Sequence, residues 1–352
     1  MKLLIVLLCF LPLLTFAQNS TVERPDKAIE PNPYQAVYFA DNNDYSKMKS
    51  IVIIHKKKYN GFRSDTSQIE YFENGLKMKT ISYRNNQPEY TTTMTYNDNQ
   101  TLNNWVIAYP KYSTKNYYEY DDKKRIITTR QVYSKIKQGK IDSTEVFEVT
   151  FKYDDNLGLI AIERKTNFGV GVETYEYNNN KQLTALKNSS IPKIFTYDDN
   201  GNISIIQEYM GRIAPEMLMD YKQFEFDENH NLIADSIVTS NNRTKNLFQK
   251  TQYFYNGNHQ LEKMKVIFDN LYRNVSFEYI DNKIQTITVE TNGQSAYLKT
   301  WMPYQLKNYY SFPITYTEVF EYDDYGNKTA KRIFVGEELF SEVEFLIEYD
   351  KD

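Results

Sequence analysis

The chain has 352 residues, with 42 basic and 46 acidic side chains and a formal net charge of −4. Charges of both signs are interspersed, so the clustered basic face of a nucleic-acid-binding protein is not expected. A chain of this length can bury a sizeable core without disulfides. Tyrosine is unusually frequent, with 32 copies, and it favours β-strands and half-buried faces.

Residues 1–17 are typical of a secretory signal peptide. Lys2 is followed by an apolar run from Leu3 to Leu14, and Thr15-Phe16-Ala17 is a small-residue cleavage site. The run is too short for a comfortable membrane helix, so we expect no membrane span after cleavage; an uncleaved N-terminal anchor is the alternative. The only cysteine, Cys9, lies in this run. We expect an exported bacterial protein that is periplasmic, on the outer surface or secreted.

Residues 18–33 are polar with three prolines and are predicted to form an extended lead. The repeat domain is predicted to span residues 34–352. Its first strands are expected at Tyr34–Phe39 and Ser50–His55, separated by the turn residues 41–44.

From about residue 69 one short pattern recurs: an aromatic residue, any residue, Tyr or Phe, then Asp or Asn, then an aliphatic residue. Such self-similarity is the signature of a repeat architecture. The clearest copies are Tyr118–Tyr120, Phe151–Tyr153, Tyr175–Tyr177, Phe195–Tyr197, Phe224–Phe226, Tyr253–Tyr255, Phe277–Tyr279 and Phe320–Tyr322. Taking the second aromatic as the anchor, the units are centred on Tyr71, Tyr96, Tyr120, Tyr153, Tyr177, Tyr197, Phe226, Tyr255, Tyr279, Tyr322 and Tyr349.

Each unit is predicted to be a β-hairpin. Two aromatics spaced by two lie on one face of a strand, and a turn such as Asp198–Asn202 follows. Gly201 and Gly326 should have positive φ. The same loop length in seven units, which place an aliphatic residue six positions after the anchor, implies one hairpin type that is reused. These residues are Leu102, Ile126, Leu159, Leu183, Ile203, Leu232 and Leu261.

The return strands carry a second aliphatic residue three positions after the first, as in Leu183 and Leu186 or Ile203 and Ile206. On a flat strand, the side chains of two residues that are three positions apart point to opposite faces. Either a β-bulge re-aims the chain or the first aliphatic residue caps the turn.

The fold is therefore predicted to be all-β, with about ten sequential antiparallel β-hairpins that form a curled or two-layered meander sheet. A flat sheet would leave the aromatic face in water. The last strand, Glu344–Tyr349, is expected either to pair within the chain or to offer an edge to a partner. Inserts at Tyr209–Pro215 and Ser295–Pro313 are either binding surfaces or plain long loops.

The segments Tyr197–Ile206 and Tyr322–Thr329 resemble the YD repeat of RHS-type proteins, and the resemblance covers about residues 69–352. It implies hairpins that pair side by side into a long curled sheet, which in some family members closes into a shell. The core boundary and C-terminal toxin of full-length members are not recognised here, so no toxin function is carried over. Short exported YD-like proteins of Bacteroidetes-type bacteria are the nearest analogue.

No residue is assigned as catalytic, cofactor-binding or metal-binding. His230 and His259 stand at the same offset in adjacent units and could share a metal ion, but zinc usually takes three or four protein ligands. The Asp-rich turns could hold calcium, although turn geometry alone explains their Asp, Asn and Gly residues. No common hydrolase or nucleotide-binding motif is present, so no cofactor is expected.

Two functions remain open. The first is a non-catalytic scaffold or binding protein of the envelope with an unknown protein partner. The second is a carbohydrate-binding protein or glycosidase, because Tyr, Trp105 and Trp301 could stack on sugars beside Asp and Asn. A cleft lined by exposed aromatics would favour the second.

Overall fold

A computed structural model describes residue 33 and residues 45–57, 63–166, 169–209, 218–241, 244–293 and 312–350. These residues form one antiparallel sheet of 22 strands. The strands are β1 Met48–Lys57, β2 Arg63–Glu73, β3 Leu76–Arg84, β4 Gln87–Tyr96, β5 Leu102–Ala108, β6 Tyr112–Tyr120, β7 Ile126–Lys137, β8 Lys140–Asp154, β9 Gly158–Thr166, β10 Gly169–Tyr177, β11 Leu183–Lys187, β12 Lys193–Tyr197, β13 Ile203–Tyr209, β14 Leu218–Phe226, β15 Leu232–Asn241, β16 Thr244–Tyr255, β17 Leu261–Phe268, β18 Leu271–Ile280, β19 Lys283–Thr291, β20 Ile314–Tyr322, β21 Lys328–Val335 and β22 Glu338–Tyr349.

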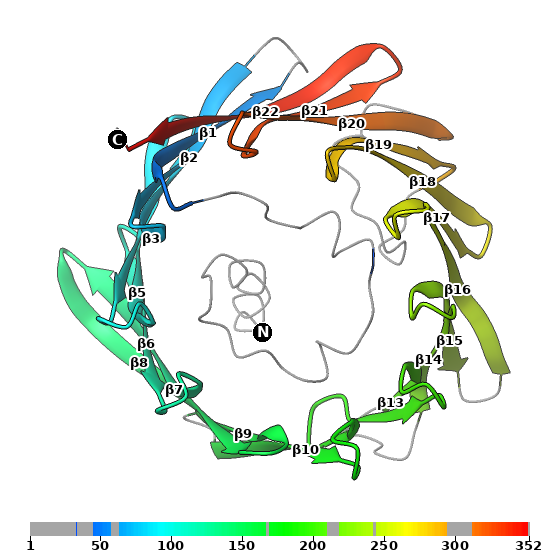
Figure 1. Cartoon of the computed structure of the whole chain (residues 1–352). Coiled ribbons are helices and arrows are strands. Elements are labelled where there is room, and N and C mark those ends of the chain that lie inside the picture. The colour runs from blue at the N-terminus through cyan, green and yellow to red at the C-terminus, as the bar shows by residue number, and fades with distance from the viewer. Residues whose placement is uncertain are drawn as a thin grey trace.

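Each strand pairs with the next one along the chain, and β22 pairs with β1 to close the ring (Figure 1). The all-β hairpin meander is therefore confirmed, whereas the curled or two-layered sheet was wrong, because the sheet closes into a barrel. Closure satisfies the backbone groups of both edge strands, which an open sheet would expose.

The closing seam joins residues from opposite ends of the described chain. Ile51 is opposite Ile347 and Ile53 is opposite Phe345, and these side chains pack around Met48 and Phe72. On the other face, Lys56 forms ion pairs with Glu342 and Glu344. The prediction that the last strand pairs within the chain is confirmed.

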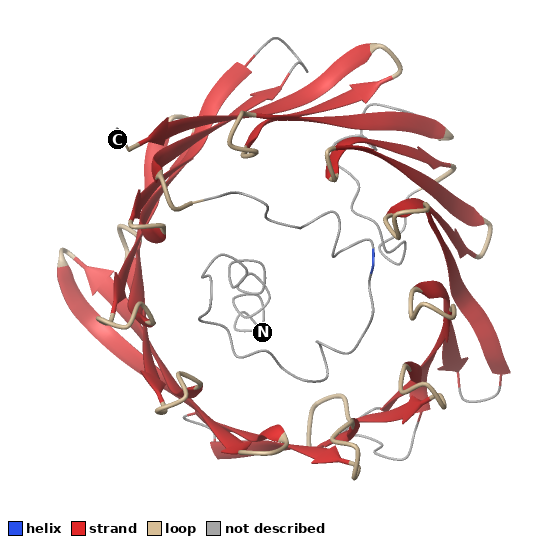
Figure 2. Ribbon diagram, in the orientation of Figure 1, coloured by secondary structure: helices blue, strands red, loops and turns tan. Residues whose placement is uncertain are grey.

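The two ends of the barrel differ in their turns. At the end that we call the turn rim, each even-numbered strand passes to the next odd-numbered strand, and the hairpin tips curve toward the axis (Figure 2). Every hairpin at this rim carries a β-bulge at the same level: Tyr197 is opposite Ile203 and Thr196 is opposite Ile205, so Ser204 is the extra residue. Bulges bend the strand that carries them, which fits the inward curve of the rim.

The bulge resolves the spacing of three in the return strands. Because Ser204 is extra, Ile203 and Ile206 lie on the same face and both are buried. Leu183 with Leu186 and Leu261 with Met264 follow the same rule. Of the two explanations that the sequence left open, the bulge is confirmed.

The anchors lie at the ends of the even-numbered strands, with one correction. In the first unit Phe72 holds the anchor position, since it is opposite Lys77 beside the bulge and is 8% exposed. Tyr71 points the other way and is 38% exposed. The choice of Tyr71 was wrong by one residue, because three aromatic or aliphatic side chains stand close together at Ile69–Phe72.

The inner face of the barrel carries the aromatic pairs, and the outer face carries most of the charged residues between them. A cluster of buried apolar side chains runs around the inner face from Leu159 on β9 to Phe340 on β22. Among the described residues no helix is long and apolar enough to cross a membrane. The predicted signal peptide, the strand Tyr34–Phe39, Trp301 and most of both inserts lie outside the described residues.

Candidate functional site on the inner wall

The residue after each anchor organises the turn rim. The Asp198 carboxylate accepts hydrogen bonds from the backbone N–H groups of Asn200 (3.0 Å) and Asn202 (2.8 Å). Gly201 has φ +83° and Gly326 has φ +84°, as predicted. The equivalent fourth position after the anchor also has positive φ at Gln100, Lys124, Lys181, His230 and His259.

One hairpin type is reused in most of the seven units, but not in all of them. In the unit of Tyr153 the positive φ falls one residue later, at Gly158. Two other units of the rim use two-residue turns with positive φ at both positions, at Asn74-Gly75 and Asp281-Asn282, as type I′ hairpins require.

The first and fifth residues of most of the five-residue turns are chemically matched. Where the first residue is Asp, the fifth is a donor: Asn231 Nδ2 lies 2.9 Å from Asp227 Oδ2. Where the first residue is Asn, the fifth is an acceptor: Asn256 Nδ2 lies 3.0 Å from Gln260 Oε1. The carboxylate and amide oxygens are thus used by the turn itself, which accounts for the Asp and Asn residues that suggested calcium.

His230 and His259 do not face each other. Each contacts the turn before its own: His230 Nδ1 lies 2.9 Å from Asn202 Oδ1, and His259 Nδ1 lies 3.4 Å from Asn231 Nδ2. Within the described ranges, no three His, Cys, Asp or Glu side chains are placed to share a metal ion. The two histidines link neighbouring turns, and nothing in their arrangement favours a metal pair.

A tyrosine hydroxyl joins most units to the unit before. The Tyr197 hydroxyl donates to the Leu183 carbonyl (2.9 Å), and the Tyr279 hydroxyl donates to the Leu261 carbonyl (2.8 Å). Burial raises the pKa of Tyr279 to about 12, so this hydroxyl stays protonated and remains a donor. The same bond, which we call a tyrosine latch, is made by Tyr96, Tyr120, Tyr153, Tyr177, Tyr255 and Tyr322.

Below the turn rim the inner wall has two sectors. The first, which we call the apolar sector, is the inner face of β9 to β21, where the apolar cluster is continuous. Its buried carboxylates have partners: Glu208 with Lys193 (3.1 Å), Glu318 with Lys331 (2.7 Å), and Asp235 with the Tyr253 hydroxyl (2.6 Å). Buried charges require such partners, so these carboxylates are committed to the wall.

The second, which we call the neutral sector, is the inner face of β4 to β7, where most side chains are uncharged and Lys135, opposite Tyr112, lies at the end far from the turn rim. Four half-buried tyrosines form a row across it. The rings of Tyr109 and Tyr112 are stacked with centroids 4.2 Å apart, and tilted contacts join Tyr90 to Tyr109 (4.8 Å) and Tyr112 to Tyr133 (5.8 Å). Nearer the turn rim, the register brings Trp105, Asn116 and Gln131 side by side on β5, β6 and β7.

One buried donor of the neutral sector, the Asn116 Nδ2, makes no hydrogen bond. Asn116 is 8% exposed, and its Oδ1 accepts from Gln131 Nε2 at 2.9 Å, but its Nδ2 has no partner. The Nε1 atom of Trp105, directly opposite Asn116, is also buried. Burial raises the pKa of Tyr118 to about 12, and a hydrogen bond with the Trp105 side chain opposes that rise. Buried donors are almost always satisfied in folded proteins.

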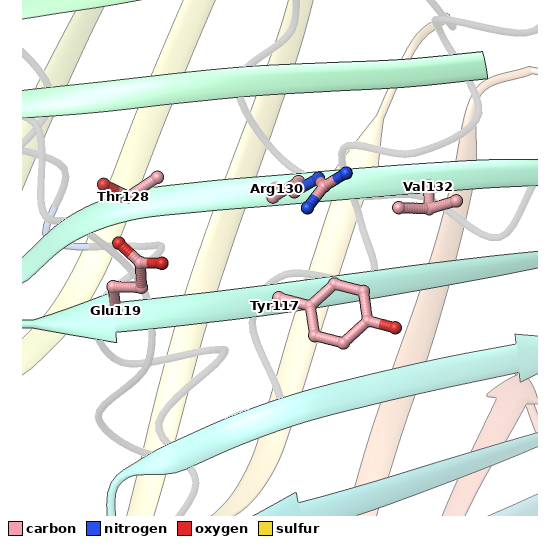
Figure 3. Close-up of a pocket in the computed structure, with 5 residues that line it drawn as sticks. All are labelled: Tyr117, Glu119, Thr128, Arg130 and Val132. Carbon is pink, nitrogen blue, oxygen red and sulfur yellow. The ribbon is translucent and has the colours of Figure 1, made fainter.

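The outer face has two shallow depressions among the described residues. One, of about 270 Å³, is lined by Tyr117, Glu119, Thr128, Arg130 and Val132 of β6 and β7 (Figure 3). The other, of about 450 Å³, lies on β17 to β19. There the Glu290 carboxylate already accepts from the Tyr272 hydroxyl (3.0 Å) and Asn274 (3.2 Å). The row of tyrosines and the unpaired Asn116 amide therefore make the neutral sector the stronger candidate.

Sequence reasoning singled out Trp105 as a possible sugar-stacking residue, but it missed Asn116 and the latches. Tyrosine was expected at half-buried faces, but the bond from its hydroxyl to a backbone carbonyl was not foreseen. The matching of Asp with Asn or Arg, and of Asn with Gln, was visible at the fixed spacing of four. Nothing in the sequence marks Asn116, because its partners come from two other strands.

The chain is similar to one protein family and, at low identity, to several solved structures. A model of the teneurin YD-shell family matches residues 53–223, a little under half of the chain. A porin-like protein from Bacteroides uniformis is 10% identical with a TM-score of 0.28, over 86% of this chain and 98% of that chain. A structure of TcdB2-TccC3 without its hypervariable C-terminal region is 10% identical with a TM-score of 0.29, over 84% of this chain and 19% of that chain.

No curated protein matches the chain. The family match falls on hairpins that carry the bulge, the turn and the latch described above. The closed wall that these hairpins build is a β-repeat shell. The chain is an RHS/YD-repeat-like protein.

Proposed function

We propose that the chain is an exported, non-catalytic scaffold of the bacterial envelope that binds a partner on the inner wall of its shell. The observation that supports this most is the neutral sector, where half-buried tyrosines and uncharged polar side chains replace the continuous apolar cluster of the rest of the wall. The signal-like run from Leu3 to Leu14 supports export.

A binding role fits the chemistry of the wall better than a catalytic one. Glu208 and Glu318 are held in ion pairs, and Asp235 accepts a hydrogen bond from the Tyr253 hydroxyl, so each carboxylate already has a structural role in the wall. A general acid or base must reach the proton that it transfers. In the neutral sector the residues around Asn116 are uncharged, namely Trp105, Thr114, Tyr118 and Gln131.

The second candidate is carbohydrate recognition. The stacked tyrosines and Trp105 favour it, because flat rings and neutral hydrogen-bonding groups suit sugars. Hydrolysis would need two carboxyl groups on either side of a glycosidic bond, and the neighbours of Asn116 supply none.

Two measurements test the proposal. Cell fractionation of the full chain should find it outside the cytoplasm, and deletion of residues 1–17 should retain it inside. The chain from Gln18 onward, immobilised and incubated with solubilised envelope material, should retain a ligand that is eluted with its mass unchanged. Cytoplasmic retention of the full chain, or release of a cleaved product, would contradict the proposal.

A further inference from the structure

The β7–β8 hairpin extends further from the turn rim than the β9–β10 hairpin beside it. Strands β7 and β8 are paired as far as their shared turn, whereas β8 stops pairing with β9 where Glu148 is opposite Lys165. Just beyond that point β9 gives way to β10, since Thr166 is already opposite Gly169. The segment Lys140–Phe147 of β8, which we call the free edge, therefore pairs with β7 on one side and with no described strand on the other. At the left of Figure 1 this hairpin extends outward from the ring of strands.

The free edge leaves backbone hydrogen-bonding groups without a partner strand among the described residues. Alternate residues of a β-strand direct their N–H and C=O groups to opposite edges, so about half of the groups here point away from β7. The side chains from Lys140 to Glu145 are all exposed, so this part of the strand is open to solvent. Unpaired edges of this kind are templates on which another chain can add a strand.

The usual protection of an edge strand covers only the tip of this one. Natural edges are protected by proline, by lysine or by a β-bulge. Here Lys140 and a bulge lie at the tip, where the register shifts between Lys135 and Ile136. Beyond them, Ser143–Phe147 follows a regular register and contains no proline. At about 3.3 Å per residue it spans roughly 15 Å, which is enough for a short added strand.

Exposed apolar side chains surround the free edge on the outer face. Ile141 of β8 is 69% exposed, and Val170 and Val172 of β10 are 58% and 37% exposed. Val146 lies on the same face, since it is opposite Val132 of the outer depression. Exposed apolar side chains that gather in one place mark interaction surfaces. A strand added along the free edge would cover part of this apolar surface with its own outward-facing residues.

The inner side of the free edge is polar. Ser143 and Glu145 lie on it, opposite Lys135 and Tyr133 of β7. Charged side chains of both signs are present there, so an added strand needs no particular net charge. The surroundings therefore favour a segment whose residues alternate between apolar, toward the outer face, and uncharged polar, toward the inner face.

We propose that the free edge of β8 accepts an extended segment of a partner protein by β-strand addition. The segment adds above the β9–β10 hairpin, with β-branched apolar residues on its outer face and polar residues on its inner face. In recognition of this kind, main-chain hydrogen bonds provide affinity and the alternate side chains provide specificity. This site is separate from the inner wall, and the inference does not rest on ligand binding there.

A synthetic peptide with this alternation tests the inference. The probe is fluorescently labelled acetyl-Thr-Val-Thr-Val-Thr-Val-Thr-amide, and its control has proline in place of each valine, because proline cannot donate to a β-ladder. Fluorescence anisotropy with the chain from Gln18 onward measures affinity, and hydrogen exchange locates the site. We expect saturable binding that is at least about tenfold tighter for the valine peptide. Protection from exchange should increase within Lys140–Phe147 and not on the inner wall of β4 to β6.

Two variants close the free edge in different ways. In the first, Val-Thr-Val-Thr is inserted after Thr166 and Thr-Val-Thr-Val before Gly169, so that the chain's own β9 covers the edge. In the second, Ile141→Lys and Thr144→Lys place cations at two exposed outward positions, as natural edge strands do. We expect each variant to weaken peptide binding about tenfold or more, and the second should leave the urea midpoint unchanged.

The matched control carries the same inserts at the β21–β22 turn, after Val335 and before Glu338. It lengthens another hairpin and leaves the free edge open, so its affinity should stay within about twofold of the parent. The lysine variant decides the question alone if the chain with the lengthened β9–β10 hairpin does not fold.

Three results would overturn the inference. One is equal binding of the valine and proline peptides, or binding of neither. Another is protection from exchange that falls outside Lys140–Phe147. The third is a concentration-dependent dimer of the chain alone in which Lys140–Phe147 is protected, because the edge would then pair with a second copy and not with a partner protein.

Discussion

The apolar and neutral sectors of the inner wall are built on the same hairpin and filled differently. In the apolar sector, Phe277 and Val275 are buried in a continuous cluster. In the neutral sector, the equivalent wall is made of Thr114, Asn116 and stacked tyrosines. Bulges and tyrosine latches occur in both sectors.

The comparison indicates that residues at the turn rim determine the fold, whereas the side chains of the inner wall can vary. Each hairpin is fixed by its turn, its bulge and its latch, all within a few residues of the turn rim. Below that level the side chains need only alternate between the two faces. We therefore expect wall substitutions to have sector-dependent effects and rim substitutions to have effects that are independent of sector.

The largest contrast is expected between core side chains of the two sectors. Phe277→Ala removes a ring that is 4% exposed and should destabilise the chain by about 3–5 kcal/mol, because it leaves a cavity. Thr114→Ala, at a residue 3% exposed in the neutral sector, should cost about 0.5–1.5 kcal/mol. Urea denaturation measures both. Equal costs would show that the two sectors are packed alike.

The shared turn should respond to backbone strain. Gly201→Val places a branched side chain at φ +83°, with its Cβ 3.3 Å from Gln182 Nε2, and should destabilise by about 1–3 kcal/mol. Lys124 holds the same turn position in the neutral sector at φ 61°. Lys124→Gly should shift the midpoint the other way by less than about 1 kcal/mol. An unchanged midpoint for Gly201→Val would contradict the turn assignment.

Removal of a tyrosine latch should destabilise the fold by the same amount in either sector. Tyr120→Phe and Tyr279→Phe each leave a carbonyl without its donor and should destabilise by about 0.5–1.5 kcal/mol. Phe226 gives the reverse test, because it stands at a latch position without a hydroxyl group. Phe226→Tyr should bring a donor to the Ile203 carbonyl and raise the urea midpoint. If only one of the two Phe variants lowered the urea midpoint, the latches would not contribute equally in the two sectors.

The smallest effect is expected at the turn carboxylates. Hydrogen bonding from Asn231 lowers the pKa of Asp227 below its usual value, against the opposing effect of burial. Because the folded-state pKa is the lower one, this stabilisation is complete above about pH 4 and is lost as pH falls through the folded-state value. Replacing Asp227 by Asn and Asn231 by Gln gives this turn the same uncharged pair that Asn256 and Gln260 form in the next unit.

The neutral pair should make the loss of stability between about pH 4 and pH 2 shallower. Thermal midpoints across that range measure the slope. The turn between β6 and β7 carries the corresponding pair, Asp121 with Arg125. Because the pKa of Asp121 is also lowered, its carboxylate should likewise lose its stabilising effect as pH falls through the folded-state value. A steeper loss in the substituted chain would show that Asp227 is not stabilising as a carboxylate.

Much of the fold could be predicted because it is local. Aromatic residues two apart, the Asp and Gly of the turns and the spacing of the aliphatic residues all lie within one hairpin, and they predicted the strands, the turns and the bulge. Closure could not be predicted, because it depends on β1 meeting β22 after twist and curvature have accumulated over the whole sheet. The neutral sector was invisible for the same reason: Trp105, Asn116 and Gln131 become neighbours only through the register of three strands.

The closing seam also bears on how the chain reaches its native state. A latch joins residues that are 14 positions apart at Tyr197 and 38 at Tyr322, whereas Lys49 and Glu348 at the seam are 299 positions apart. Short loops close at small entropic cost, and contacts distant in sequence form slowly. We expect hairpins to assemble quickly onto their neighbours and the seam to form last. Until then β1 and β22 are two unprotected edges, so the time that the arc stays open sets its exposure to aggregation.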